Sequence, residues 1–477
     1  MDNANRKMSR RQVLTWGFGL ASVSLLSACS TSSPAATPAA TAAATAAPKP
    51  AGTSAPAVAT PAPSAAGFDW MQQKGKTLVV SAVLAVYYPV LQKLVPEFQK
   101  MTGIEVDFQV VPEQQLRQKL PIELNAKSSA IDVYVTSMHV EKILFTKAGW
   151  YEPLNKYLEN PKMTPPDYDW KDIGPAGVSW ATTQDGKIVA IPMGVGLVGN
   201  MWRQDVYDEA GVKAATSMDE MIAAIKKVHK PPTMYGFVGR GLKNANIPVW
   251  GDFMTALGGS YLSADKKELT CTTPEAVEAA RIYADLMKNY APPGSIGFNW
   301  TECQGSFSQG QVATWPDSIQ FAAPFEDKTK SKVAGKNSYS PHPGSPKFKP
   351  FGGTSMDALA INPFGKNKDA AWLFTAWASS KDVHRKMMLE AAMIGTRQSI
   401  YAEAEFIKNH SMPKVWVDAV AAALQNTRPQ LPELQDVSLF RDTYGVALVK
   451  MIEGGDPKTL LEQATKEFEP TFKKNLG

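Results

Sequence analysis

The sequence has few of the residues that support catalysis or metal binding. Only three cysteines and five histidines occur in 477 residues, and the histidines are scattered without the spacing of a metal site. Neither the G-x-S-x-G elbow of hydrolases nor the G-x-x-x-x-G-K-[ST] phosphate loop occurs. The sequence does not decide whether two carboxylates form the catalytic pair of a glycosidase, because the distance between them is set by the structure. These absences predict a protein that is not an enzyme and needs no metal or cofactor.

The chain also lacks a block of basic residues. Its formal charge is +5, but residues 1–28 hold a net +3 and Lys49 adds one more. About +1 therefore remains for residues 68–477. A body of this charge has no stripe of cations that could follow phosphates, so we expect no nucleic-acid partner.

The N-terminal segment has no apolar run of the length that a permanent membrane helix needs, about 20 residues. The uncharged stretch 13–26 follows Arg10-Arg11 and ends at Leu26-Ser27-Ala28-Cys29, as in a secretory signal. Its end resembles the lipobox of bacterial lipoproteins, and its paired arginines resemble a twin-arginine signal. We predict a signal peptide over 1–28 and a lipidated Cys29. The alternative is an ordinary export signal with a spare cysteine.

Residues 29–67 hold almost no charge and little apolar bulk. They are nearly all Ala, Pro, Thr and Ser, a composition that predicts a disordered linker. The other two cysteines, Cys271 and Cys303, follow far downstream. In an oxidising compartment they could pair, and two buried free thiols are the equal alternative.

The remaining 410 residues exceed what one hydrophobic core usually serves, so two lobes are expected. The order is strand 77–85, helix 89–101, strand 104–111 and helix 113–124, then a strand near 131–135. Such alternation predicts a parallel α/β sheet. Pro96 predicts a kink or restart in the first helix, and Gly103 predicts its end.

One glycine-rich stretch suggests a different activity. Residues 194–199 read Gly-Val-Gly-Leu-Val-Gly after a strand, which matches the G-x-G-x-x-G of dinucleotide-binding proteins. The bulky residues that follow, Asn200-Met201-Trp202, argue against a Rossmann helix. Glycines at a crossover between lobes explain the stretch more simply, and an exported NAD(P)-dependent oxidoreductase remains the less favoured alternative.

Aromatic residues are plentiful in the body, which holds 11 of the 12 tryptophans. Trp250, Trp300 and Trp315 stand in loop-like contexts, where flat rings could cover the C–H faces of a sugar. Trp372 and Trp377 lie on an apolar helical stripe and are expected in the core.

Several segments together resemble the extracellular solute-binding proteins of ABC importers, in particular the sugar-binding lipoproteins related to maltose-binding protein. The matching segments are 94–104 (LVPEFQKMTGI), 186–192 (GKIVAIP), 205–211 (DVYDEAG), 273–280 (TPEAVEAA), 307–313 (FSQGQVA) and 369–374 (DAAWLF). They run in order over nearly the whole body. The sequence departs from the family at Trp202-Arg203 and at 313–318, so the sugar stays unnamed.

The resemblance implies an α/β, two-lobe periplasmic-binding-protein fold (type II), with crossing strands and a ligand cleft between the lobes. Carried over by segment, lobe one is 75–193 with 315–362, and lobe two is 197–312 with 366–477. The crossovers fall near 192–197, near 312–315 and after 360–363. Closure of the lobes on a ligand belongs to the known hinge motions.

The resemblance further implies a receptor that captures a sugar or oligosaccharide and delivers it to an ABC permease. The receptor would be exported, anchored through Cys29 to the bilayer at the outer face of the cytoplasmic membrane, and monomeric. A receptor for a non-sugar solute, such as an anion, peptide or polyamine, is the alternative. The expected ligand-binding residues are Tyr87, Tyr88, Ser137, Trp250, Trp300, Trp315, Asp317, Gly353, Thr354 and Arg397.

Overall fold

The first part of the folded chain alternates strand and helix in the predicted order. The computed structural model describes residues 67–84 and 87–476. It begins with β1 (Thr77–Val83), α1 (Tyr88–Thr102), β2 (Glu105–Val111), α2 (Glu113–Asn125) and β3 (Val133–Ser137). Strand β1 pairs in parallel with both β2 and β3. The predicted parallel α/β unit is confirmed.

Local sequence signals set the ends of several helices. Helix α1 continues through Pro96, so of the kink or restart expected there the restart does not occur. Gly103 ends the helix in the left-handed region at φ 67°. The Ser217 side chain and Glu220 form a capping box at the start of α7 (Met218–Val228). Helix α9 (Pro274–Asn289) begins after Thr273, whose side chain accepts a hydrogen bond from the amide of Ala276.

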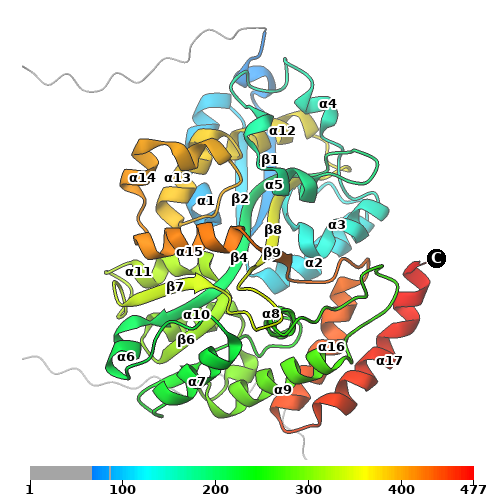
Figure 1. Ribbon diagram of the computed structural model, residues 1–477. Coiled ribbons are helices and arrows are strands. Elements are labelled where there is room, and N and C mark those ends of the chain that lie inside the picture. Colours follow the sequence, from blue (N-terminus) through cyan, green and yellow to red (C-terminus); the bar gives the residue numbers. More distant parts are fainter. Residues whose placement is uncertain (1–66, 85–86, 477) are drawn as a thin grey trace, which may run out of the picture. The chain divides into compact units, whose positions relative to one another are not determined.

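Two long strands join the two halves of the body. Strands β4 (Ile191–Arg203) and β8 (Gly352–Ile361) are antiparallel neighbours in the strand order β2-β1-β3-β8-β4-β6-β5. The first half of β4 pairs with β8, and its second half pairs with β6 (Val312–Ser318) and β7 (Asn337–Pro341). Figure 1 shows β4 passing between the group that holds α1, α12 and α13 and the group that holds α7 and α9. This strand coincides with the crossover expected near 192–197.

We call the first group lobe one. Its strands are β1, β2, β3, β8 and the start of β4, and their apolar side chains share one core with the flanking helices. Trp372 and Trp377 lie in this core, as predicted. The helices of lobe one are α1, α2, α3 (Met138–Lys147), α4 (Asn155–Leu158), α5 (Pro175–Ala181), α12 (Lys368–Ala378), α13 (Lys381–Ala391) and α14 (Ala404–Asn409).

Lobe two contains the rest of the sheet and two main cores. One core lies among α7, α8, α9, α16 and α17, and the other joins β6 to α10, α11 and α15. Its remaining elements are β5 (Tyr235–Phe237), α6 (Gln204–Glu209), α8 (Ile247–Ala256), α10 (Trp300–Ser308), α11 (Ala323–Glu326), α15 (Lys414–Leu424), α16 (Val437–Ile452) and α17 (Pro457–Leu476). The short strand β9 (Thr427–Pro429) pairs with β8.

The packing places two segments differently from the expected lobe boundaries. Residues 315–351 were expected in lobe one, but β6 and β7 pair with the second half of β4, and Phe321 and Phe325 join the core of α10. Helices α12 and α13 were expected in lobe two, but they fill the core beside β1 and β3. The chain therefore returns to lobe one at β8.

The glycines at 194–199 lie inside β4 rather than in a loop before a helix. A methyl group at Gly196 would come within 2.1 Å of the Ser355 hydroxyl, and one at Gly199 within 2.4 Å of the Ser340 carbonyl. Close approach of neighbouring strands thus explains these glycines. The dinucleotide interpretation is wrong, because a pyrophosphate site needs the N-terminus of a helix at that point.

The two cysteines of the body are free thiols. Cys271 and Cys303 are fully buried and belong to separate core clusters. Burial raises the pKa of Cys271 to about 12, so the thiol stays protonated and unreactive. This settles the open alternative against a disulfide. Within the described residues, no helix is both long and apolar enough to span a membrane.

Candidate functional site

A small cavity is lined by side chains from both lobes, and we call it the cleft cavity. Its volume is about 90 Å³, far below the ~300–1,000 Å³ of pockets for drug-sized ligands. Lobe one contributes Val83, Glu113, Arg117, Ser137, His139, Ser355 and Asp357, and lobe two contributes Arg240, Pro248, Trp300, Ser318, Gln320, Phe321, Gln430, Leu431 and Arg441. The cavity size suits a small solute.

On the lobe-one side, a partly buried ion-pair network is built from α2 and α3. Arg117 donates to Glu113, one helical turn earlier, and to Glu141, each at 3.0 Å. Burial would raise the pKa of Glu113, but the nearby guanidiniums of Arg117 and Arg441 outweigh it and lower the pKa to about 2. Glu113 is therefore a fixed anion in the cavity wall, available to accept hydrogen bonds.

Asp357 stands beside this network on β8. Its carboxylate accepts a hydrogen bond from the hydroxyl of Tyr87 at 3.2 Å and another from Ser137 at 3.1 Å. Burial raises its pKa to about 6, despite the opposing effect of Arg117. Two of the predicted residues, Tyr87 and Ser137, thus meet at an acceptor that the sequence did not reveal.

Arg240 and Asp317 form a bidentate ion pair on the lobe-two side. The guanidinium Nε and Nη2 donate to the carboxylate at 2.8 and 2.6 Å, and the Asp317 side chain is 2% exposed. Asp317 was predicted to bind ligand directly, but it does not line the cavity. Instead it holds Arg240, which does.

Of the three tryptophans, only Trp300 reaches the cleft cavity. Its ring stacks on Phe321 with centroids 4.8 Å apart, and its Nε1 donates to Glu113 across the two lobes at 3.2 Å. Trp315 lies behind Phe321, fully buried, and its Nε1 donates to Asp317. Trp300 and Phe321 therefore form an apolar wall next to charged groups.

Arg441, on α16, completes the cavity. Its Nε donates to the carbonyl of Asn244 at 3.0 Å. Burial lowers its pKa to about 10, and repulsion from Arg117 acts in the same direction. Arg441 is 5% exposed and forms no ion pair among the described residues, whereas Arg117 and Arg240 both do.

The other predicted residues do not line the cavity. Trp250 is fully buried in the core of lobe two, where its Nε1 donates to the Ala276 carbonyl at 3.0 Å. Arg397 is fully buried in lobe one, donates to the carbonyl of Ser379 at 2.9 Å and lies over the Tyr168 ring. The indole N–H of Trp250 is thus already used within lobe two, whereas Arg397 is buried away from the cleft cavity, with its Nη2 lacking a hydrogen-bond partner among the described residues.

Three further predicted residues lie near the cavity without lining it. The Thr354 hydroxyl donates to the Arg428 carbonyl in β9, and Gly353 sits close to the Asp252 carboxylate, 2.6 Å from where a Cβ would be. Tyr88 is buried beside Tyr87, with ring centroids 4.6 Å apart. These residues shape the ends of β8 and α1.

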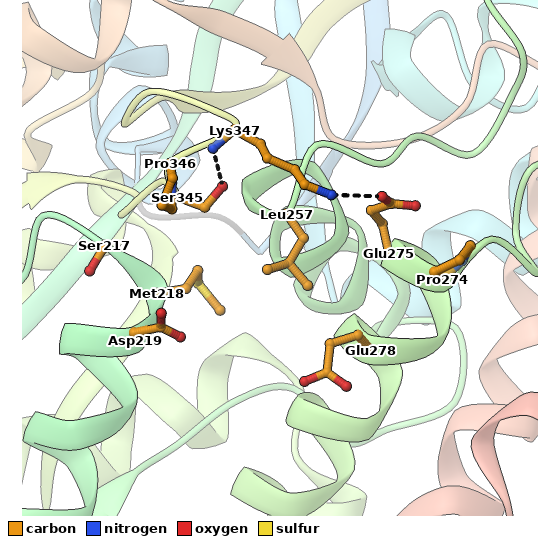
Figure 2. Close-up of a pocket in the computed structure, with 10 residues that line it drawn as sticks. All are labelled: Ser217, Met218, Asp219, Leu257, Pro274, Glu275, Glu278, Ser345, Pro346 and Lys347. Carbon is orange, nitrogen blue, oxygen red and sulfur yellow. Dashed lines mark hydrogen bonds and ion pairs between the residues drawn. The ribbon is translucent and has the colours of Figure 1, made fainter.

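A second hollow lies on the surface of lobe two alone. Figure 2 shows it between the first turns of α7 and α9, with Lys347 paired to Glu275 at 3.2 Å. Its volume of about 350 Å³ exceeds that of the cleft cavity. It is open to solvent and takes no residue from lobe one, so lobe closure cannot act on it. We regard the cleft cavity as the functional site.

The described residues contain no group of three His, Cys, Asp or Glu side chains that could hold a metal ion. His139 lines the cavity, but burial lowers its pKa to about 3, so the ring is neutral at physiological pH.

Comparison with known proteins agrees with this architecture. Residues 81–384 match the family model of the bacterial extracellular solute-binding proteins. The erythritol/L-threitol-binding protein of Mycolicibacterium smegmatis is 25% identical, over 97% of this chain and 96% of the relative.

Two solved structures with bound polyols are also similar. A solute-binding protein of an ABC transporter from Agrobacterium radiobacter, in complex with ribitol, has 25% identity and a TM-score of 0.76, over 84% of this chain and 99% of that chain. One from Agrobacterium vitis, with bound D-mannitol, has 26% identity and a TM-score of 0.75 over the same shares. The expected two-lobe fold is thereby confirmed.

Proposed function

Because the chain belongs to the bacterial extracellular solute-binding protein family and acts as the receptor of an ABC importer, we propose that its solute is a small alditol or sugar. The observation that carries the proposal is the cleft cavity. It combines charged acceptors, charged donors and a stacked aromatic wall in a small space.

Each part of the cavity suits a part of a polyol. Hydroxyl groups both donate and accept, so they satisfy the carboxylates of Glu113 and Asp357 as well as the guanidinium of Arg240. The Trp300 ring covers the C–H face of the carbon chain. A volume of about 90 Å³ favours a small solute over an oligosaccharide. The relatives named above for erythritol, ribitol and mannitol support the same class.

Binding is proposed to close the lobes about β4 and β8. Two hydrogen bonds already join the lobes beside the cavity, Trp300 to Glu113 and Gln114 to Asn244. A solute between the lobes adds further hydrogen bonds from one lobe to the other. Because these contacts exist only when the lobes are closed, binding favours the closed form over the open one. The closed receptor then presents the solute to the permease. No catalytic step is proposed.

The alternative solutes fit the cavity less well. A polyamine would meet three guanidiniums, those of Arg117, Arg240 and Arg441, against two carboxylates, those of Glu113 and Asp357, so cations outnumber anions in the cavity wall. A peptide of several residues exceeds the cavity volume. We therefore retain the polyol as the proposed class.

The membrane attachment is also a proposal. The twin-arginine signal over 1–28, the lipidated Cys29 and the linker over 29–67 lie outside the described residues. The lipobox pattern supports export and an anchor at the outer face of the cytoplasmic membrane. A monomer on a linker suits a receptor that must move between solute capture and the permease.

A thermal-shift screen tests the proposed function. The described residues from 67 onward belong to one compact unit. For the screen, a fragment of residues 63–477 is heated with erythritol, ribitol, mannitol, glucose, amino acids and polyamines. A ligand at 100 times its Kd adds about 2.7 kcal/mol to the folded state. We expect the largest shift from an alditol or sugar and none with the Trp300→Ala variant. A shift with amino acids or polyamines alone would contradict the proposal.

A further inference from the structure

The charges around the cleft cavity are not all paired. Arg117 is paired with Glu113 and Glu141, and Arg240 is paired with Asp317. Two charged residues of the cavity wall remain, one anion and one cation. They are Asp357 and Arg441, and neither forms an ion pair within the part of the chain that the structure describes.

Asp357 belongs to lobe one, and only uncharged groups donate hydrogen bonds to its carboxylate. Tyr87 and Ser137 each take one carboxylate oxygen, and a carboxylate offers about four acceptor positions. Because a buried anion is stable only when it is hydrogen-bonded or paired, the remaining positions favour a solute that donates. A hydroxyl fulfils this need, and a second carboxylate opposes it.

Arg441 belongs to lobe two and has the reverse requirement. Of its five N–H groups, one donates to the Asn244 carbonyl. The charges that act on it include two more guanidiniums, those of Arg117 and Arg240, whose repulsion adds to the cost of burial, while the carboxylates of Glu113 and Asp442 act in the opposite direction. A solute oxygen here accepts hydrogen bonds, and a negative oxygen also reduces the repulsion.

The two residues line the cavity from opposite lobes. Arg117 and Glu113 act on both of them, so the two residues belong to one connected set of charges. A solute held between the lobes contacts both.

We propose that Asp357 and Arg441 determine which polyols the receptor accepts, by binding the solute from opposite lobes. This inference rests on the proposed function. Asp357 requires a hydroxyl beside it, and Arg441 accepts either a hydroxyl or a carboxylate. The substrate class is therefore uncharged alditols and their monocarboxylic acids, and the dicarboxylic acids are excluded because one carboxylate would face Asp357.

Calorimetric titration of residues 63–477 with D-mannitol, D-mannonate and D-mannarate at pH 7.5 tests the inference. Mannitol and mannonate are expected to bind within about tenfold of each other, and mannarate at least ~100-fold more weakly, because two carboxylates cannot both ionise at one site without a large cost. Equal binding of mannitol and mannarate would overturn the inference while leaving the proposed function intact. Failure of mannitol and ribitol alike to bind would remove both.

Variants assign the selectivity to the two residues. Asp357→Asn should recover mannarate binding at least ~10-fold, and Arg441→Gln should weaken mannonate more than mannitol. Asp418→Asn breaks an exposed pair with Lys414 on α15 and should change neither ratio. If Asp357→Asn leaves the discrimination against mannarate unchanged, Asp357 does not determine it. The titration of the unmodified protein with the three solutes does not depend on any variant folding. It can therefore refute the inference even if both variants fail to fold.

Discussion

Replacing Asp317 by asparagine removes the carboxylate that holds Arg240 in the wall of the cleft cavity. Two short hydrogen bonds, 2.8 and 2.6 Å, join the pair, and the Arg240 side chain is 12% exposed. Asparagine keeps the shape of the residue but provides no negative charge. Arg240 would then be a buried cation without a counter-ion, and its direction toward the cavity would no longer be fixed.

The expected loss of stability is about 3–5 kcal/mol, the range for removing one partner of a buried ion pair. Urea unfolding of residues 63–477 measures it. The double variant Arg240→Met/Asp317→Leu removes both charges and should recover much of the loss. The exposed pair of Lys414 and Asp418 gives the matched control, for which Asp418→Asn should cost at most about 1 kcal/mol.

The same variant should also weaken polyol binding, because Arg240 no longer presents its guanidinium to the solute. Affinity at 25 °C, measured by calorimetry on protein that is still folded, separates this effect from stability. A loss of stability below about 1 kcal/mol for Asp317→Asn would refute the reasoning. So would a double variant that is less stable than the single one.

Three further predictions follow from particular contacts. Trp250→Phe should cost about 1–3 kcal/mol of stability, through a lost hydrogen bond and a small cavity, with unchanged solute affinity; weaker binding would return Trp250 to the site. Since burial raises the pKa of Asp357 to about 6, protonation below that value should lower solute affinity about tenfold from pH 7 to pH 5, and a flat calorimetric profile would contradict this. The stability of the solute-free protein should change with pH in the opposite direction. Ionising Asp357 costs more free energy in the folded than in the unfolded chain, so the free energy of unfolding should fall as the pH rises toward 6. Gly199→Ala should lower the urea midpoint, because its methyl group would meet the Ser340 carbonyl at 2.4 Å, whereas Gly305→Ala, with open space around it, should not.

Local structure could be predicted because its determinants are close in the sequence. The end of the first helix at Gly103 depends on residues within one turn, and it is confirmed. The caps at Thr273 and Ser217 are set equally locally. The alternation of strands and helices between residues 77 and 137 is confirmed for the same reason.

The lobe that a late segment joins could not be predicted in this way. Helices α12 and α13 follow β8 and fill the core of lobe one, although α16 and α17 after them fill lobe two. Each helix has an apolar face that either lobe could bury. The choice depends on contacts between residues hundreds of positions apart, which periodicity does not record.

The binding residues were only partly predictable, for a related reason. Aromatic side chains in loop-like contexts suggested three tryptophans, yet only Trp300 lines the cavity. Glu113 and Arg117 stand four residues apart on one helix face, a spacing that could have indicated a pair. Little near Arg441 in the sequence marks it, because all its charged neighbours except Asp442 come from α2 and from the segment before α8.

A crystal structure of residues 63–477 with the alditol that gives the largest thermal shift tests the central claim most directly. The account predicts one solute in the cleft cavity, with hydroxyls on Asp357 and Arg441 and its carbon chain against Trp300. A solute bound elsewhere, such as the hollow between α7 and α9 in Figure 2, with the cleft cavity empty, would contradict it.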